Sequence, residues 1–132
     1  MSSELVYIGY ADGACRHMQN IVSAAWVIYS PSSQPISSCK ACLGPATNNL
    51  VEYSSVIELF SDAIGHGIGH LIVKIDSQLV VSQLNGLYVV RNSIILTKFL
   101  RVKLLECCFN LLLIIIFLGD SIMYLIHMQI MY

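Results

Sequence analysis

The chain has 132 residues, of which 56% are hydrophobic and only 11% charged, and its formal net charge is −1. This length suits one domain with a sizeable core, and the near-neutral charge excludes a protein that is strongly basic over its whole surface. The first residues, MSSELVYIGY, carry Glu4 and no basic residue, so they do not resemble a secretory signal peptide. Five cysteines without such a signal are typical of reduced thiols, which favours a cytoplasmic or nuclear location.

The first part of the chain predicts three strands. Stretches rich in β-forming residues cover 5–11, 21–30 and 35–44, and the turn sequence PSSQP separates the second from the third. Short connections predict that these strands form an antiparallel meander. Cys39 and Cys42 make one CxxC pair in the third stretch. Because no second pair accompanies it, two ordinary strand cysteines are favoured over a zinc site.

From Thr47 the apolar period becomes that of a helix, which Gly65 and Gly67 end. The apolar residues at helical spacing are Leu50, Tyr53, Ile57, Phe60 and Ile64. Residues 70–76 then predict a nearly continuous apolar strand of the kind that is buried on both faces. A short helix over 77–86, with Ser77 as N-cap, and a longer one over about 92–108 follow. This order predicts an α/β domain with a mixed sheet.

Three acids stand out by their position. Asp12 follows the first predicted strand, and Asp76 ends the fourth, where open α/β sheets place their sites. Glu52 falls in a helical row with Val56, Leu59 and Ala63, so it should face the sheet, where a carboxylate is costly unless it is paired or binds metal. Position alone leaves two interpretations open. The acids form a metal site, or they are a turn residue, a solvated helix acid and an acid at a helix start.

The segments around these acids are YADGACR, ATNNLVEY and DSQLVVSQLNGLYVVRN. In this order they resemble the type 1 ribonuclease H domain of the ribonuclease H-like superfamily, in the reverse-transcriptase-like form abundant in plant genomes and retroelements. The match spans residues 5 to about 109. The resemblance implies an α/β fold with a mixed five-stranded sheet, whose first three strands are antiparallel, and flanking helices.

The resemblance also implies a chemistry. Asp12, Glu52 and Asp76 correspond to the first three of four acids that hold two Mg²⁺ ions, with Mn²⁺ as the alternative, and that hydrolyse the RNA of an RNA–DNA hybrid. Hydrolysis of a phosphodiester needs an activated water and a stabilised leaving oxygen, and hard carboxylates are the ligands that Mg²⁺ prefers. No nucleophilic side chain is required by this chemistry.

The expected partner is nucleic acid, without a membrane. By resemblance Asn48, Asn49 and Gln78 contact the minor groove of the hybrid, where backbone and 2′-OH contacts replace base readout. The alternative role for the two asparagines is helix N-capping. The chain's basic cluster lies further on and consists of Arg91, Lys98, Arg101 and Lys103. We expect Arg91 to bind nucleic acid, and for the cluster both phosphate binding and a solvated helix face are open.

The C-terminal residues do not continue the resemblance. Relatives carry a motif like HIPRGFN..AD.LAN, whose Asp is the fourth metal ligand, and no such motif occurs here. Residues 111–118 are instead apolar throughout, until Gly119, Asp120 and Ser121 interrupt them. A membrane helix needs about 20 apolar residues, so this stretch is a poor span and fits a final strand better.

The genetic code offers an explanation for the missing motif. When the last base of each codon is read with the first two of the next, residues 128 and 129 must give Ala, and residues 123 and 124 must give Val. The neighbouring codons from Ile115 onward permit HIPRGFN-x-V-S-D-S-(H/Y)-A-N, which restores the motif together with its Asp. The sequence therefore predicts that the reading frame slips by one base between about Asn110 and Ile115.

The predicted organisation is a ribonuclease H-like domain over residues 1–110, incomplete at its C-terminus, and an out-of-frame apolar tail over 111–132. The predicted function is Mg²⁺-dependent endonucleolytic cleavage of RNA–DNA hybrids, impaired in this chain. The alternative is a catalytically inactive nucleic-acid-binding remnant of a retroelement. A small membrane-tethered protein is a third, weaker interpretation.

Overall fold

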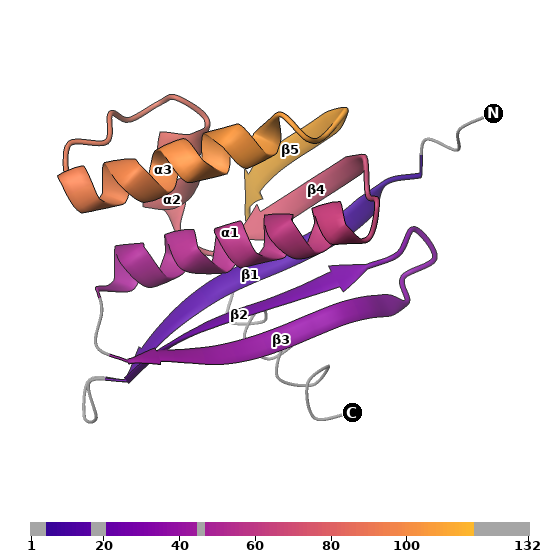
Figure 1. The fold of residues 1–132 in the computed structure, drawn as a ribbon, viewed down its shortest axis with the longest axis horizontal. Helices are drawn as coiled ribbons and strands as arrows, with labels where there is room; N and C mark the ends of the chain where they lie inside the picture. Colours follow the sequence, from indigo (N-terminus) through magenta and orange to yellow (C-terminus); the bar gives the residue numbers. More distant parts are fainter. Residues whose placement is uncertain (1–4, 17–20, 45–46, 118–132) are drawn as a thin grey trace.

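The computed structural model describes residues 5–16, 21–44 and 47–117, and in them five strands form one mixed sheet with three helices on one face (Figure 1). The strands are β1 (Tyr7–Arg16), β2 (Ile21–Tyr29), β3 (Pro35–Gly44), β4 (His70–Ile75) and β5 (Leu111–Ile116). The helices are α1 (Asn48–Gly65), α2 (Gln78–Leu84) and α3 (Ser93–Glu106).

The sheet has the order β3-β2-β1-β4-β5. The pairs β1–β2 and β2–β3 are antiparallel, whereas β4 runs parallel to both β1 and β5. The meander comes first because its connections are short, and the parallel strands need the helices as crossovers. The predicted α/β fold, with a mixed five-stranded sheet whose first three strands are antiparallel, is confirmed. Cys39 and Cys42 both lie in β3, the strand predicted for them.

Two details of the predicted strands were wrong. β1 does not end before Asp12 but continues to Arg16, because β2 pairs with it as far as Arg16 opposite Ile21. β4 is not buried on both faces, since its residues alternate between buried and half-buried. The buried positions are Leu71, Val73 and Ile75. The described helices cover only one face of the sheet, which explains this alternation (Figure 1).

Helix α1 begins and ends where its sequence directs. Thr47 is the N-cap, and its side chain accepts a hydrogen bond from the backbone N–H of Leu50 at 3.3 Å. At the other end Gly67 has a φ of 72°, a left-handed conformation that glycine adopts without strain. The chain can therefore turn directly into β4. Both predicted limits of this helix are confirmed.

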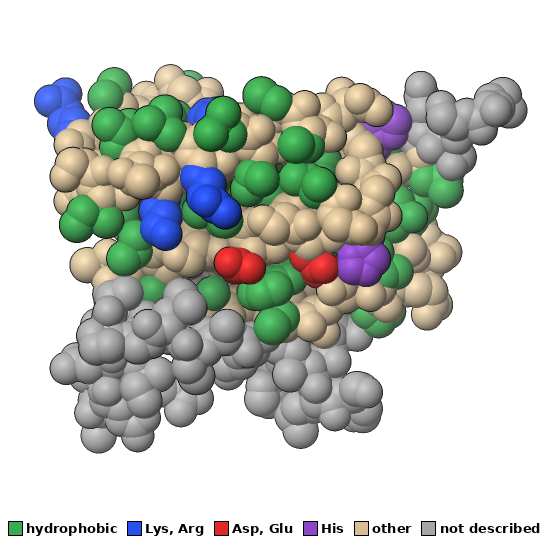
Figure 2. All heavy atoms as spheres, viewed as in Figure 1, with side chains coloured by type: hydrophobic (Ala, Val, Ile, Leu, Met, Phe, Trp, Pro, Cys, Tyr) green, Lys and Arg blue, Asp and Glu red, His purple; other side chains and the backbone are tan. Residues whose placement is uncertain are grey.

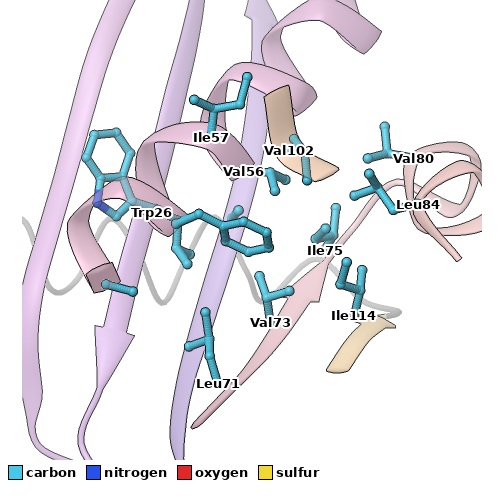
Figure 3. Packing of buried hydrophobic residues seen from close by; sticks show 14 of the residues in the cluster. Trp26, Val56, Ile57, Leu71, Val73, Ile75, Val80, Leu84, Val102 and Ile114 are labelled. Carbon is cyan, nitrogen blue, oxygen red and sulfur yellow. The ribbon is translucent and has the colours of Figure 1, made fainter. Parts of the chain in front are cut away.

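The main hydrophobic core lies between the sheet and the helices (Figure 3). Every described element except β3 and β5 contributes side chains that are at most 8% exposed, among them Trp26, Val56, Phe60, Leu71, Val80 and Val102. Complete burial of one such side chain contributes about 1.5–3 kcal/mol. The sheet and the three helices therefore form one cooperative unit.

A polar contact fixes the C-terminal half of α1 to the meander. The Trp26 indole Nε1 donates a hydrogen bond to Oδ2 of Asp62 at 3.2 Å, and the Ser37 hydroxyl donates to the same oxygen. His66 lies one turn further on, with its Nδ1 3.3 Å from Oδ1 of Asp62. Asp62 therefore has a structural role that the sequence pattern did not reveal.

The apolar stretch after residue 110 contributes the last strand. β5 pairs with β4 from His70 opposite Leu111 to Ile75 opposite Ile116, so the expectation that this stretch forms a final strand is confirmed. The predicted domain boundary at 110 and the out-of-frame origin of 111–132 stay predictions. Asp120 lies outside the described residues. Within the described ranges, none of the helices is both long enough and apolar enough to cross a membrane.

The close approach of α1 to β1 generates a testable prediction. A Cβ at Gly9 would lie 2.9 Å from both terminal methyl carbons of Leu59. Gly9→Ala should therefore lower the free energy of unfolding by about 1–3 kcal/mol, measured by urea or thermal unfolding. Gly65→Ala is the control, because nothing lies within 4 Å of its added methyl group, and it should be neutral or slightly stabilising. Equal losses in both variants would contradict the tight contact.

Candidate active site

Two aspartates meet at one end of the sheet. β1 and β4 pair in parallel up to Ala11 opposite Ile75, and Asp12 and Asp76 are the next residue of each strand. They therefore occupy neighbouring positions at the carboxyl ends of adjacent parallel strands, the place where open α/β sheets hold their sites. Asp12 is only 5% exposed, whereas Asp76 is exposed.

Glu52 reaches the sheet from helix α1. It is 7% exposed, and the residues that follow it on the same helical row, Val56, Leu59 and Ala63, are fully buried. Its Oε2 atom is withdrawn from solvent. The expectation that this row faces the sheet is confirmed, and the alternative of a solvated helix acid is excluded. Burial of a carboxylate in such a row is costly and is typical of a functional position.

The three acids approach this end of the sheet from both of its faces. Asp12 lies directly opposite Ala25, which belongs to the small cluster on the face away from the helices. Glu52, by contrast, comes from the helix side. Within residues 5–16, 21–44 and 47–117, accordingly, no three His, Cys, Asp or Glu side chains form a group that could hold a metal ion. The donor chemistry suits Mg²⁺, but the geometry of a complete metal site is not formed by the described residues.

The expected nucleic-acid contacts lie around these acids. Asn49 is an exposed residue in the first turn of α1, and Gln78 is the exposed first residue of α2. Arg91 is exposed in the connection before α3. Asn48 is the first residue of α1, and the structure does not describe its side chain. Thr47 caps α1, so N-capping does not explain the two asparagines.

Comparison with known proteins decides the family. A sequence profile described as Reverse transcriptase-like matches residues 10–108. This chain belongs to that family. It is also 34% identical to Ribonuclease HI of Halobacterium salinarum over 77 residues, which are 58% of this chain and 39% of that protein. It is 30% identical to the bifunctional protein Rv2228c of Mycobacterium tuberculosis over 101 residues, 76% of this chain and 28% of that protein.

Solved structures give the same assignment. RNase H1 from Halobacterium salinarum has a TM-score of 0.82 and 27% identity, with 88% of both chains covered. The N-terminal RNase H domain of Rv2228c has a TM-score of 0.84 and 25% identity, covering 90% of this chain and 92% of that one. LC11-RNase H1, solved in complex with an RNA/DNA hybrid, shares the fold with a TM-score of 0.80 and 23% identity. The predicted membership of the type 1 ribonuclease H-like superfamily is confirmed.

A contact that the sequence pattern missed positions α2 in this ribonuclease H-type domain. The hydroxyl of Tyr53, next to Glu52, donates a hydrogen bond of 2.7 Å to Oε1 of Gln83. Burial raises the pKa of Tyr53 to about 12, so the hydroxyl stays protonated and remains a donor. The bond joins the first turns of α1 to the helix that follows Asp76. The helical period had identified Tyr53 only as an apolar residue.

The basic cluster of the ribonuclease H-type domain divides into two parts. Lys103 is used inside the fold, because its Nζ donates to the backbone oxygen of Leu84 at 2.5 Å and lies 3.0 Å from Oε2 of Glu106. Lys98 and Arg101 have no such ion pair in the described part of the chain. The cluster is therefore neither wholly a binding surface nor wholly a solvated helix face.

The Tyr53–Gln83 contact predicts a measurable loss of stability. Tyr53→Phe should lower the free energy of unfolding by about 1 kcal/mol, because the buried hydrogen bond disappears while the ring remains. Tyr88→Phe is the matched control, since Tyr88 is 59% exposed and should change stability very little. Chemical unfolding of the two variants under one set of conditions measures the difference. If Tyr53→Phe proved as harmless as its control, the contact would not hold α2 in place.

Proposed function

We propose that this chain is a ribonuclease H-type domain that binds RNA–DNA hybrids and hydrolyses their RNA strand with divalent ions, weakly in its present sequence. The observation that carries the proposal is the register of β1 and β4, which brings Asp12 and Asp76 to adjacent strand ends beside the buried Glu52. The relatives named as ribonucleases H support it. Because the chain spans only 28% and 39% of the lengths of the two curated relatives, activity and substrate are proposals.

Asp12, Glu52 and Asp76 are the residues that would hold Mg²⁺ or Mn²⁺. When bound, such ions supply an activated water and stabilise charge on the leaving oxygen. The protein contributes the position of its acids. Glu52 is fixed by the helix that packs on the sheet, and Asp76, which is exposed, can meet a substrate arriving from solvent.

Asn48, Asn49, Gln78 and Arg91 would contact the hybrid. Their positions, at the starts of α1 and α2 and before α3, flank the strand ends that carry the two aspartates. Amide side chains can donate to and accept from 2′-OH groups and sugar oxygens, whereas Arg91 offers its guanidinium to a phosphate. Such contacts favour the shape of a hybrid over any base sequence.

Weak activity is proposed for two reasons. No group of three acids is formed within the described residues, and the motif that supplies the fourth acid is absent from the sequence. The same two observations favour the alternative, a nucleic-acid-binding remnant of a retroelement that no longer cleaves. Cleavage separates the two functions, because both bind nucleic acid and only the first hydrolyses it.

The metal proposal is tested by thermal unfolding. Mg²⁺ at about ten times its dissociation constant should stabilise the fold by about 1.4 kcal/mol, which raises Tm by several degrees. Asp76→Asn should reduce this gain, because it removes a carboxylate from the strand end. Glu58→Gln removes an exposed acid of α1 outside this set and should keep the gain. A Tm that does not respond to Mg²⁺ or Mn²⁺ in the unmodified chain would refute a functional metal site.

The frame proposal is tested by a paired cleavage assay. A version read in the other frame after about Asn110 should regain an Asp across the present codons of Leu125 and Ile126. With the fourth acid present, Mg²⁺-dependent cleavage of a labelled RNA–DNA hybrid should rise by roughly a hundredfold or more, the scale of a lost group that acts directly in catalysis. Asp12→Asn in the restored version is the control for contaminating nuclease. Equal cleavage by both versions would mean that the fourth acid is dispensable.

A further inference from the structure

The α2–α3 half of the helical layer carries a local positive charge that the net charge of the chain conceals. Residues 77–105 contain Arg91, Lys98, Arg101 and Lys103 and no Asp or Glu. In a chain of net charge −1, such a segment gives part of the surface a positive potential that attracts anions.

Two of these cations remain available to a ligand. Lys103 is occupied by Glu106 and the Leu84 carbonyl, and its Nζ lies 5.5 Å from the centre of the Phe99 ring. The ion pairs among the described residues are those of Lys103 with Glu106 and of His66 with Asp62. Lys98 and Arg101, one turn apart on α3, are therefore not neutralised by an ion pair with any described carboxylate.

Lys98 and Arg101 line a cleft of about 210 Å³ together with Ser54, Ile57 and Glu58 of α1. Figure 2 shows basic side chains gathered over the boundary between α1 and α3, with acidic side chains further along α1. The volume admits a phosphate group with a few waters, since one water occupies about 30 Å³ in the liquid. Ser54 donates its hydroxyl hydrogen to the Leu50 carbonyl, so the donors that remain for an anion are the two cations.

We propose that this cleft between α1 and α3 binds a backbone phosphate of the RNA–DNA hybrid, at a distance from the carboxylates. The inference rests on the proposed function, because it takes the same nucleic acid as the ligand. Lys98 supplies a point charge, and the planar guanidinium of Arg101 matches two phosphate oxygens. Glu58 lies in the same cleft and opposes the bound phosphate, which keeps this contact weak and the complex reversible.

The position of the cleft fixes which phosphate it can take. Glu58 follows Glu52 by six residues, which is roughly 9 Å along the axis of α1. Crossing to α3 adds a helix–helix distance of about 8–10 Å, so the cleft is roughly 13 Å from Glu52. At about 3.4 Å per nucleotide along a strand, the contact falls about four nucleotides from the cleaved bond. Hybrids that end before this point should not reach the cleft.

The test measures binding without cleavage. The full chain is titrated with a labelled RNA–DNA hybrid of roughly twelve base pairs in EDTA, over a series of salt concentrations. Replacing Lys98 and Arg101 with Gln together should weaken binding about tenfold at low salt and reduce the salt slope by about two, one per lost phosphate contact. Glu58→Gln should strengthen binding, because it removes the opposing charge. Hybrids of about four base pairs should bind the parent and the double variant equally.

Lys74→Gln is the matched control, because it removes one positive charge near the aromatic cluster on the other face of the sheet, where Lys74 lies over Tyr10 and Phe117. It should leave the salt slope unchanged. An unchanged affinity in the double variant, or an equal loss in the control, would overturn the inference while leaving the proposed function intact. Loss of hybrid binding that follows the cleft, in a chain that never cleaves RNA, would support the inference and refute the nuclease activity. A parent chain that binds no hybrid would overturn both.

Discussion

The contact of helix α1 with strand β1 governs the rest of this structure. Gly9 allows Leu59 to lie directly on the strand, and the same helical row then brings Val56 and Glu52 against the sheet. One flat contact therefore buries the core at one end of the helix and a carboxylate at the other. The Asp62 contacts with Trp26 and Ser37 fix the far end of α1, so the helix cannot rotate Glu52 away from the sheet.

The charge distribution follows from this arrangement. The acids gather where β1 and β4 end and α1 begins, whereas the available cations lie along α3, which packs beside α1. A polyanion that approaches this surface meets repulsion at the carboxylates unless divalent ions are bound there, and attraction beside them. Separate regions of opposite charge on two packed helices suit a ligand that must be held in one place and cut in another.

The last strand shows that pairing and chemistry impose different demands on the same residues. Leu111–Ile116 is apolar enough to complete the sheet beside β4, because a strand is stabilised by its backbone hydrogen bonds and by one buried face. Catalysis instead requires one acid at a specified place. A frame slip can therefore leave the sheet with five strands and still remove a ligand. This is why the fold is convincing even where the function is proposed to be weak.

The sequence by itself determined the elements and their order, because those depend on local patterns: the period of α1, the Thr47 cap, Ser77 before α2 and the glycines after α1. It also identified Asp12, Glu52 and Asp76, since acids are conspicuous in apolar surroundings. Only the tertiary structure decided that β1 extends past Asp12 and that β4 has one half-buried face, because both depend on neighbouring strands and helices. It likewise paired Tyr53 with Gln83 and separated Lys103 from Lys98 and Arg101. Those contacts join residues far apart in the chain, and no local period records which side chains packing brings together.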